Sequence, residues 1–169
     1  MPDSTLRAVD GVPRSARRHG ANPILRIEGL VARPLALAPA DLAHLPRHPF
    51  TGSISCVERG NIPDTDWSGL AVADLLALAE PLPGARFVRI CAGPYVTPLA
   101  LDVADGALLC DQLAGSALPL ERGGPWRLVI PGTRYYTSVK WVDLLEITAE
   151  EPDNVAERLA AARNRPRKG

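Results

Sequence analysis

Apolar and polar residues alternate over several short stretches of the chain, and this period of two predicts β-strands. Short apolar runs bounded by Gly or Pro predict the same element when both of its faces are buried. The segments that fit one of these two patterns are residues 24–31, 53–57, 86–91, 126–130 and 139–148. A fold built mainly from short strands is therefore expected.

Helical spacing is clearest after Ser68, where the sequence is strongly apolar. The apolar residues that recur three and four positions apart are Leu70, Val72, Leu75, Leu76 and Ala79. This spacing places them on one face of a helix, which the prolines that follow would end. Shorter helices are predicted for residues 39–45, with a proline in the first turn, and after Asp153, which can cap the last helix.

The segments between these elements predict irregular structure. Residues 1–22 are polar and interrupted by Arg, Gly and Pro, and we expect an extended arm there. Residues 58–66 predict a loop. Residues 107–110 and 118–120 flank a Gly-Ser pair, which predicts either a hairpin or a short helix-to-strand connection.

Strands mixed with a few short helices predict an α+β fold with mixed, mostly antiparallel sheets. The composition agrees, because the 169 residues include 17 Pro and 14 Gly. Proline interrupts helices and central strands, so a long-helix bundle and a coiled coil are excluded. The many turns also favour loops, where functional sites are usually built.

The charge balance narrows the expected partners. The formal net charge is 0, from 19 Lys+Arg and 19 Asp+Glu, so no nucleic-acid partner is expected.

No apolar run approaches the roughly 18 residues of a membrane span. The first residues lack the apolar core of a secretory signal, so the chain as written is expected to be cytoplasmic, or periplasmic if a leader has been trimmed away.

The three cysteines are an odd number and form no Cys-x-x-Cys pair, which excludes a disulfide framework and a zinc knuckle. Cys91 and Cys110 lie within apolar strings and predict core positions. Cys56 ends a predicted strand near Arg59. A thiolate beside a cation is a candidate nucleophile or soft-metal ligand, and the alternative is a buried small apolar residue.

Two basic segments are candidate anion sites. Arg17, Arg18 and His19 are consecutive and can bind an anion through charge-assisted hydrogen bonds, or form a mobile basic arm. Arg134 and Lys140 place two cations near one predicted loop-to-strand junction. That junction is a candidate phosphate cradle, and the alternative is a solvated surface. Motifs of serine hydrolases, dinucleotide-binding folds and P-loops are absent from the sequence.

Taken in order, several motifs resemble the molybdopterin-binding domain of the sulfite oxidase superfamily. Cys-Val-Glu at 56–58 is similar to the motif of the periplasmic methionine sulfoxide reductase branch. The other motifs are Arg-Arg-His-Gly-Ala-Asn-Pro at 17–23, Trp-Ser-Gly-Leu-Ala-Val-Ala-Asp-Leu-Leu at 67–76, Gly-Pro-Trp-Arg-Leu-Val-Ile-Pro-Gly at 124–132 and Ser-Val-Lys-Trp-Val at 138–142. The resemblance covers residues 17–150 and implies one domain there, while the polar and basic composition of the two ends predicts a flexible arm over 1–16 and a basic helix or tail over 151–169.

The resemblance also implies a molybdenum-molybdopterin cofactor and oxygen-atom transfer to or from a small oxyanion or sulfoxide. Cys56 would ligate molybdenum, Tyr95 would be an active-site tyrosine, and Arg17 would attract the substrate. The residues implied to contact the cofactor are Arg18, His19, Arg59, Arg134, Ser138, Val139 and Lys140. The implied partners are a small-molecule substrate and a separate electron-transfer partner such as a cytochrome.

One departure from the family keeps a second interpretation open. Longer members carry a His and an Arg in an extended loop, where this chain has only Cys-Ala-Gly-Pro at 91–94. A non-catalytic binding or accessory module that keeps the fold without molybdenum is therefore the alternative to the enzyme.

Overall fold

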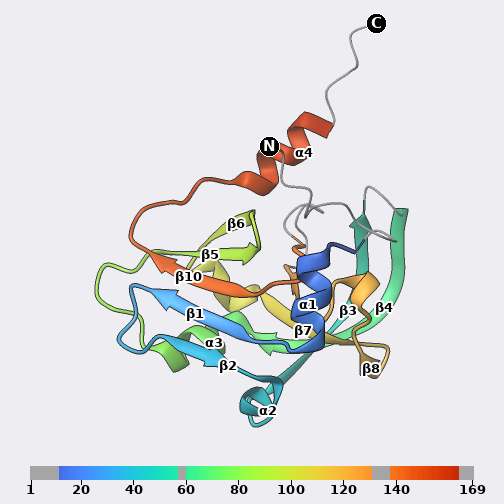
Figure 1. Ribbon diagram of the computed structural model, residues 1–169, viewed down its shortest axis with the longest axis horizontal. Helices are drawn as coiled ribbons and strands as arrows, with labels where there is room; N and C mark the ends of the chain where they lie inside the picture. The colour runs from blue at the N-terminus through green and yellow to red at the C-terminus, as the bar shows by residue number, and fades with distance from the viewer. Residues whose placement is uncertain (1–11, 57–59, 131–137, 164–169) are drawn as a thin grey trace, which may run out of the picture.

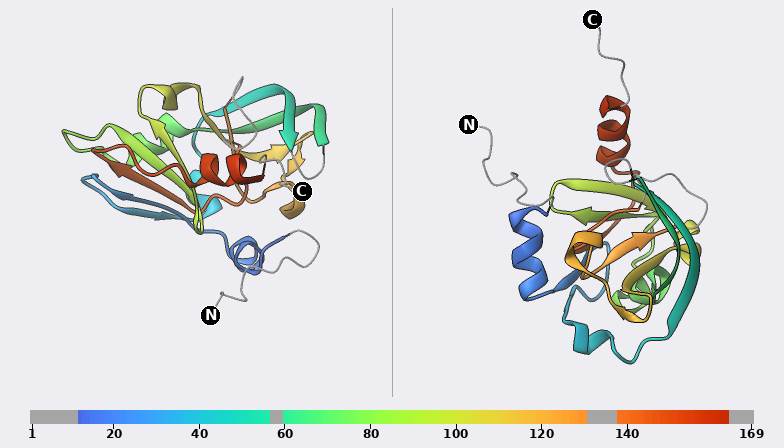
Figure 2. Two further views of the ribbon diagram at one scale, coloured as in Figure 1. Left: turned by 90° about the horizontal axis from the view of Figure 1, so that it is seen from above. Right: turned by 90° about the vertical axis from the view of Figure 1, so that its right-hand side faces the viewer.

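The computed structural model describes residues 12–56, 60–130 and 138–163 (Figure 1). The described strands form two sheets, which Figures 1 and 2 show from three directions. The first has the order β2-β1-β10-β5-β6, and the second the order β3-β4-β7-β8, with β9 paired to β7. The described helices are α1 (Arg14–Ala21), α2 (Pro39–Leu42), α3 (Val72–Ala79), α4 (Val155–Arg163) and the 3-10 turns η2 (Val103–Gly106) and η3 (Leu120–Arg122).

The first sheet forms from strands whose alternation is visible in the sequence. Its strands are β1 (Leu25–Gly29), β2 (Leu35–Leu37), β5 (Phe87–Ala92), β6 (Tyr95–Ala100) and β10 (Leu144–Thr148). Leu25 and Ile27 of β1 are fully buried while Arg26 between them is exposed, as a pleated strand with one solvated face requires. β1 and β10 pair in parallel, with Ile27 opposite Leu145, and the other pairs between described strands are antiparallel. The predicted α+β class is confirmed.

The second sheet contains a long hairpin that the sequence pattern did not predict. Its strands are β3 (Arg47–Cys56), β4 (Gly60–Ala71), β7 (Leu108–Leu113), β8 (Ser116–Ala117) and β9 (Arg127–Val129). The loop expected over residues 58–66 is wrong from residue 60 onward, because β4 pairs with β3 from Cys56 opposite Gly60 up to Arg47 opposite Leu70. Backbone pairing stabilises this strand although its own sequence holds Gly, Asn and Pro.

The strongest predicted helix, α3, is confirmed but begins at Val72 instead of directly after Ser68. The preceding residues belong to β4 and pair with β7. The residues that α3 buries are Val72, Leu75, Leu76 and Ala79, at the predicted spacing. They pack with the inward residues of the first sheet and with Leu109 and Leu128 of the second in one hydrophobic cluster.

Three further expectations are corrected. Residues 14–21 form α1 instead of an extended arm, because Ala16 buries its side chain and the helix contacts η3. The strand expected over residues 139–148 begins only at Leu144, since Trp141 has a φ of 59° that interrupts an extended chain. β6 was not expected; it is an edge strand, where Pro98 is tolerated.

The ends of the described chain differ in their packing. α4 contacts β6 and otherwise extends away from the sheets (Figures 1 and 2). Asn154 caps α4, with its Oδ1 accepting from the Glu157 amide at 2.9 Å, while the expected cap, Asp153, pairs with Arg158 at 2.7 Å. Among the described helices, none combines the length and apolar character needed to cross a bilayer.

Candidate functional site

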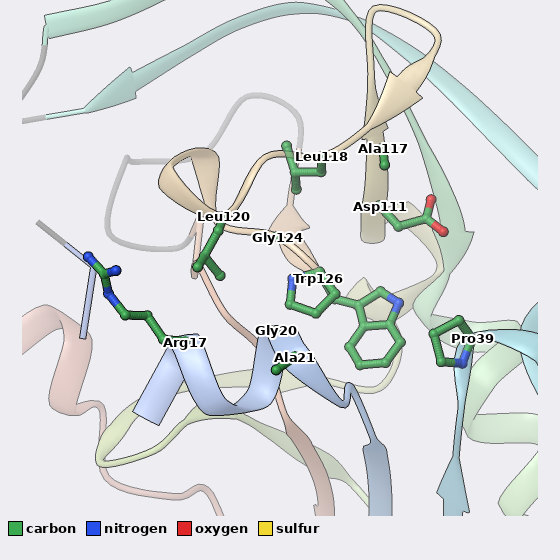
Figure 3. Close-up of a pocket in the computed structure, with 11 residues that line it drawn as sticks. Arg17, Gly20, Ala21, Pro39, Asp111, Ala117, Leu118, Leu120, Gly124 and Trp126 are labelled. Atoms are coloured by element: carbon green, nitrogen blue, oxygen red, sulfur yellow. The ribbon is translucent and has the colours of Figure 1, made fainter. Parts of the chain in front are cut away.

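Three segments that are far apart in sequence meet beside the second sheet: α1, η3 and residues 138–142. α1 and η3 are in close contact, since a Cβ added at Gly20 would lie 3.0 Å from Cδ1 of Leu120. Figure 3 shows Leu120 directed toward α1. Residues 138–142 run beside β9, where the Leu128 amide donates to the Val139 carbonyl at 2.8 Å and the Val142 amide to the Trp126 carbonyl at 2.9 Å.

A cavity of about 430 Å³ opens between α1 and the turn that carries η3 (Figure 3). Its volume lies within the range of small-molecule pockets. Arg17 of α1 lines it on one side and Asp111 of β7 on another, and the Asp111 carboxylate pairs with Arg47. The residues that complete its lining are Gly20, Ala21, Pro39, Ala117, Leu118, Leu120, Gly124, Pro125 and Trp126. Most of the wall is therefore apolar, and Arg17 is the one predicted site residue among the described residues that line it.

His19 has one ring nitrogen without a partner. Its ring packs against Trp126, with the centroids 5.6 Å apart. Nε2 lies 2.9 Å from the Ile24 carbonyl oxygen, and because a carbonyl only accepts, Nε2 carries the proton. In the neutral ring Nδ1 is then an acceptor, and it is buried with no hydrogen-bond partner in the described part of the chain. A buried polar atom of this kind is rare and indicates a place for a missing group.

Arg127 of β9 is a buried arginine, 2% exposed, that joins several segments. Its Nε donates to Ser138 Oγ at 3.2 Å and its Nη1 to the Arg122 carbonyl at 2.9 Å. The guanidinium carbon lies 5.6 Å from the ring centroid of Trp67, whose indole nitrogen is also buried without a partner among the described residues. Ser138 Oγ in turn donates to the Leu128 carbonyl at 3.1 Å. One cation thus links β9, η3, β4 and the Ser138 segment.

Lys140 lies over the same turn. Its Nζ is 3.5 Å from the Glu121 carbonyl oxygen and 5.5 Å from the Trp141 ring centroid. Its stem passes Gly123, where an added Cβ would come 2.8 Å from the Lys140 Cγ. Gly123 also has a φ of 105°, so both the space and the backbone conformation require glycine there.

The other predicted site residues are placed as follows. Arg17 and Arg18 are exposed on α1, and Val139 is 2% exposed. Tyr95 begins β6 in the first sheet, opposite Ala92, and is half-buried. The backbone of Cys56 ends β3, but the Cys56 side chain and the whole of Arg59 and Arg134 lie outside the described residues. The roles expected for these residues stay predictions.

The two cysteines predicted to be core residues are confirmed as such. Cys91 and Cys110 are 3% and 0% exposed. Burial raises the pKa of Cys91 from 9.0 to about 11 and the pKa of Cys110 from 9.0 to about 12. Because the thiolate is the reactive form, both are inert near neutral pH.

Sequence reasoning missed Arg127 and the two tryptophans that contact the site, Trp67 and Trp126. The available signal was an arginine inside the apolar string Trp-Arg-Leu-Val-Ile at 126–130. An arginine within a strand that is buried on both faces must find partners inside the protein. The sequence alone does not name those partners, because they come from η3, β4 and residue 138.

Comparison with known proteins identifies the class to which this fold and site belong. The sequence profile of the family described as oxidoreductase molybdopterin binding domain matches residues 12–156, so the chain belongs to that family. The expected resemblance to the sulfite oxidase superfamily is confirmed.

Two relatives make the comparison specific. Over 98 residues the chain is 37% identical to a protein from Fusarium oxysporum named nitrate reductase [NADPH]; this covers 52% of the chain and 11% of that protein. The fold of the present chain is similar to that of a chain in the crystal structure of the sulfane dehydrogenase SoxCD from Paracoccus pantotrophus, with a TM-score of 0.69 and 28% identity. That match covers 76% of this chain and 38% of the other. The chain therefore spans only a minor part of each relative's length.

Proposed function

We propose that the chain is the molybdopterin-binding part of an oxidoreductase that transfers an oxygen atom to or from a small oxyanion or sulfoxide. The match of the family profile over residues 12–156 is the observation that carries this proposal. When the substrate is a sulfoxide, it takes up two electrons and two protons, and its oxygen leaves as water. Molybdenum held by the pterin would supply the two-electron chemistry at the reacting atom.

Whether the cofactor fits can be judged from the buried polar groups. His19 Nδ1 is a buried acceptor that no donor in residues 12–56, 60–130 or 138–163 reaches, and the N–H groups of a pterin ring are donors of the required kind. Ser138 and Lys140 lie on a segment that runs beside β9 next to the buried Arg127 guanidinium. The Lys140 ammonium is a cation that suits the cofactor phosphate, whereas the Ser138 hydroxyl proton is already donated to the Leu128 carbonyl. The described donor set thus fits the group.

In this proposal each remaining side chain has a task that follows from its chemistry. Cys56, at the end of β3, supplies a thiolate, which is a soft ligand suited to a metal that also has sulfur ligands. The exposed guanidinium of Arg17 attracts an anionic or strongly dipolar substrate toward the site. Tyr95 has a phenol that can donate a hydrogen bond to a substrate oxygen.

Electrons must enter or leave through another protein or domain. The name of the Fusarium relative gives NADPH as its reductant, and the chain corresponds to 11% of that protein. We therefore propose a separate electron-transfer partner, a cytochrome or similar protein, for this chain.

The test is molybdenum content and turnover after production in a host that makes the cofactor. The wild-type chain is expected to carry about one molybdenum per chain by elemental analysis, and to turn over nitrate, sulfite or methionine sulfoxide with an artificial electron donor or acceptor. Cys56→Ser is expected to abolish turnover with the fold intact by circular dichroism. Cys91→Ala is the matched control, since the Cys91 thiol is buried on the other sheet.

The outcomes separate the two interpretations of the sequence. A folded wild-type protein that carries no molybdenum would refute the proposed enzymatic function and favour the interpretation as a non-catalytic accessory module. Turnover in Cys56→Ser equal to that of the Cys91→Ala control would show that Cys56 is not the metal ligand.

A further inference from the structure

We propose that Trp141 is a positioning residue, which holds η3 against α1 and so fixes His19 relative to the Ser138–Lys140 segment. The inference rests on the proposed function, because the positioned groups are those assigned to the cofactor. It assigns a role to a residue that touches neither substrate nor cofactor in the proposal above.

The backbone of Trp141 is the first observation. Its φ of 59° lies in the left-handed region, which is a strained conformation for a bulky side chain. Such residues persist only where the surroundings impose them, and they concentrate at functional sites. Contacts on both sides impose it here: the Trp141 amide donates to the Gly123 carbonyl at 3.0 Å, and the next amide, Val142, donates to the Trp126 carbonyl at 2.9 Å.

This conformation changes where two consecutive side chains lie. In an extended strand, neighbouring side chains point to opposite faces. At Trp141 the alternation is broken, and Lys140 Nζ and Trp141 Nε1 both reach η3. Nε1 donates to the Leu120 carbonyl at 2.7 Å, while Nζ lies 3.5 Å from the Glu121 carbonyl oxygen.

The contacts together hold the whole turn. Arg127 Nη1 donates to the Arg122 carbonyl at 2.9 Å, so the three consecutive carbonyls of η3 each face a different side-chain donor. Two of these donors are cations, and cations at the carbonyl end of a helical turn are electrostatically favourable. The Trp141 indole makes the shortest of the three contacts.

η3 transmits this contact to α1. Leu120 packs against Gly20 so closely that a Cβ there would lie 3.0 Å from the Leu120 Cδ1, and Figure 3 shows this approach. His19, the neighbour of Gly20, has its ring nitrogen bonded to the Ile24 carbonyl and its ring against Trp126. A movement of η3 would therefore shift the helix that carries His19 relative to the segment that carries Ser138 and Lys140.

Two variants and one control test the role. Trp141→Phe keeps an aromatic ring beside Lys140 but removes the donor to the Leu120 carbonyl. Trp141→Gly relaxes the left-handed backbone and removes the ring as well. The control, Ile90→Val, removes one buried methylene from β5 in the first sheet, where Ile90 is fully buried. It lowers stability but keeps the three side-chain donors to the η3 carbonyls.

Two measurements follow on each protein. Hydrogen exchange is recorded at the amides of Gly123 and Gly124, which donate to the Leu120 and Pro119 carbonyls. The loss of molybdopterin during dialysis is followed by the fluorescence of the oxidised pterin. In Trp141→Phe, exchange at both amides and the rate of cofactor loss are each expected to rise about fivefold over Ile90→Val, the effect of one hydrogen bond. Trp141→Gly is expected to lose the cofactor faster still, although its backbone is relaxed.

The results distinguish this inference from the proposed function. Wild-type protein that retains no molybdopterin would refute both. If the wild type retains it and Trp141→Phe retains it as well as Ile90→Val does, only the inference is overturned. Faster amide exchange in Trp141→Phe with unchanged cofactor retention would also overturn it, because Trp141 would then serve folding alone.

Discussion

Replacing Arg127 with methionine should destabilise the protein, but by less than the sum of the interactions that the guanidinium makes. Methionine keeps most of the stem but removes the donors to Ser138 Oγ and the Arg122 carbonyl and the cation over Trp67. Two charge-assisted hydrogen bonds contribute about 1.5–3 kcal/mol each, and the cation–π contact about 1–2 kcal/mol. Against this, methionine avoids the several kcal/mol that burial of a charge costs.

The net effect follows from what is left behind. The Arg122 carbonyl loses its side-chain donor, and because this contact is only partly buried, the cost of the unsatisfied acceptor stays at or below about 1–3 kcal/mol. We expect Arg127→Met to lower the free energy of unfolding by about 2–3 kcal/mol, within the range of measured buried polar deletions. For a chain of this size that corresponds to a fall in Tm of about 4–12 °C.

The assay is thermal unfolding followed by circular dichroism, with Arg89→Met as the control. Arg89 pairs with Glu146 at 2.9 Å, but both side chains are about a third exposed, at 35% and 31%, so this pair contributes only about 0–1 kcal/mol. A fall in Tm for Arg127→Met no larger than for Arg89→Met would refute the reasoning. Arg127→Lys should not restore stability, because one ammonium cannot reproduce the fork of guanidinium donors.

Two further predictions concern the second sheet and the cysteines. Gly69→Ala should lower the yield of folded protein severely, because the added Cβ would lie 2.3 Å from a backbone oxygen of β7. The control Gly106→Ala should express normally, because its added Cβ would have no atom within 4 Å. Equal yields of the two variants would contradict the close approach of β4 and β7 at Gly69. At pH 8 a thiol reagent should label Cys56 of the cofactor-free protein before Cys91 and Cys110, as mass spectrometry can show. The two buried thiols have pKa values raised to about 11 and about 12. The stability that their burial contributes is therefore present below pH 9 and falls as the pH rises toward 11. Rapid labelling of Cys91 or Cys110 at pH 8 would contradict their burial.

How much of the fold the sequence predicts depends on where each element's stability originates. β1 and β5 were predicted from patterns within each strand, the alternation of apolar and polar residues in β1 and the short apolar run typical of a buried strand in β5. β4 was not, because Pro63 and its neighbours carry no strand pattern and the strand is stabilised by pairing with β3 and β7. α1 was missed for a related reason, since its one buried residue is Ala16, and packing against η3 stabilises a helix with little apolar surface of its own.

The candidate site divides in the same way. His19, Ser138 and Lys140 were predicted as site residues from short motifs that resemble a known family, and no long-range geometry was needed to name them. Arg127 and Trp141 were not found, because their importance lies in which carbonyls they reach. Those carbonyls belong to η3, where Arg122 is 5 residues from Arg127 in sequence but Leu120 is 21 residues from Trp141.

By itself, the sequence determined the class of fold, the buried faces of the best strands, the inert cysteines and the family. The first three are properties of single residues or short windows, where a period of two or three to four residues is physically sufficient, and the family follows from the resemblance of several motifs taken in order. Only the tertiary structure decided that α1, η3 and residues 138–142 meet, that no donor among the described residues reaches His19 Nδ1, and that Trp141 adopts a left-handed backbone. Hydrogen bonds between such distant segments depend on the packing of both sheets, so no local pattern records them.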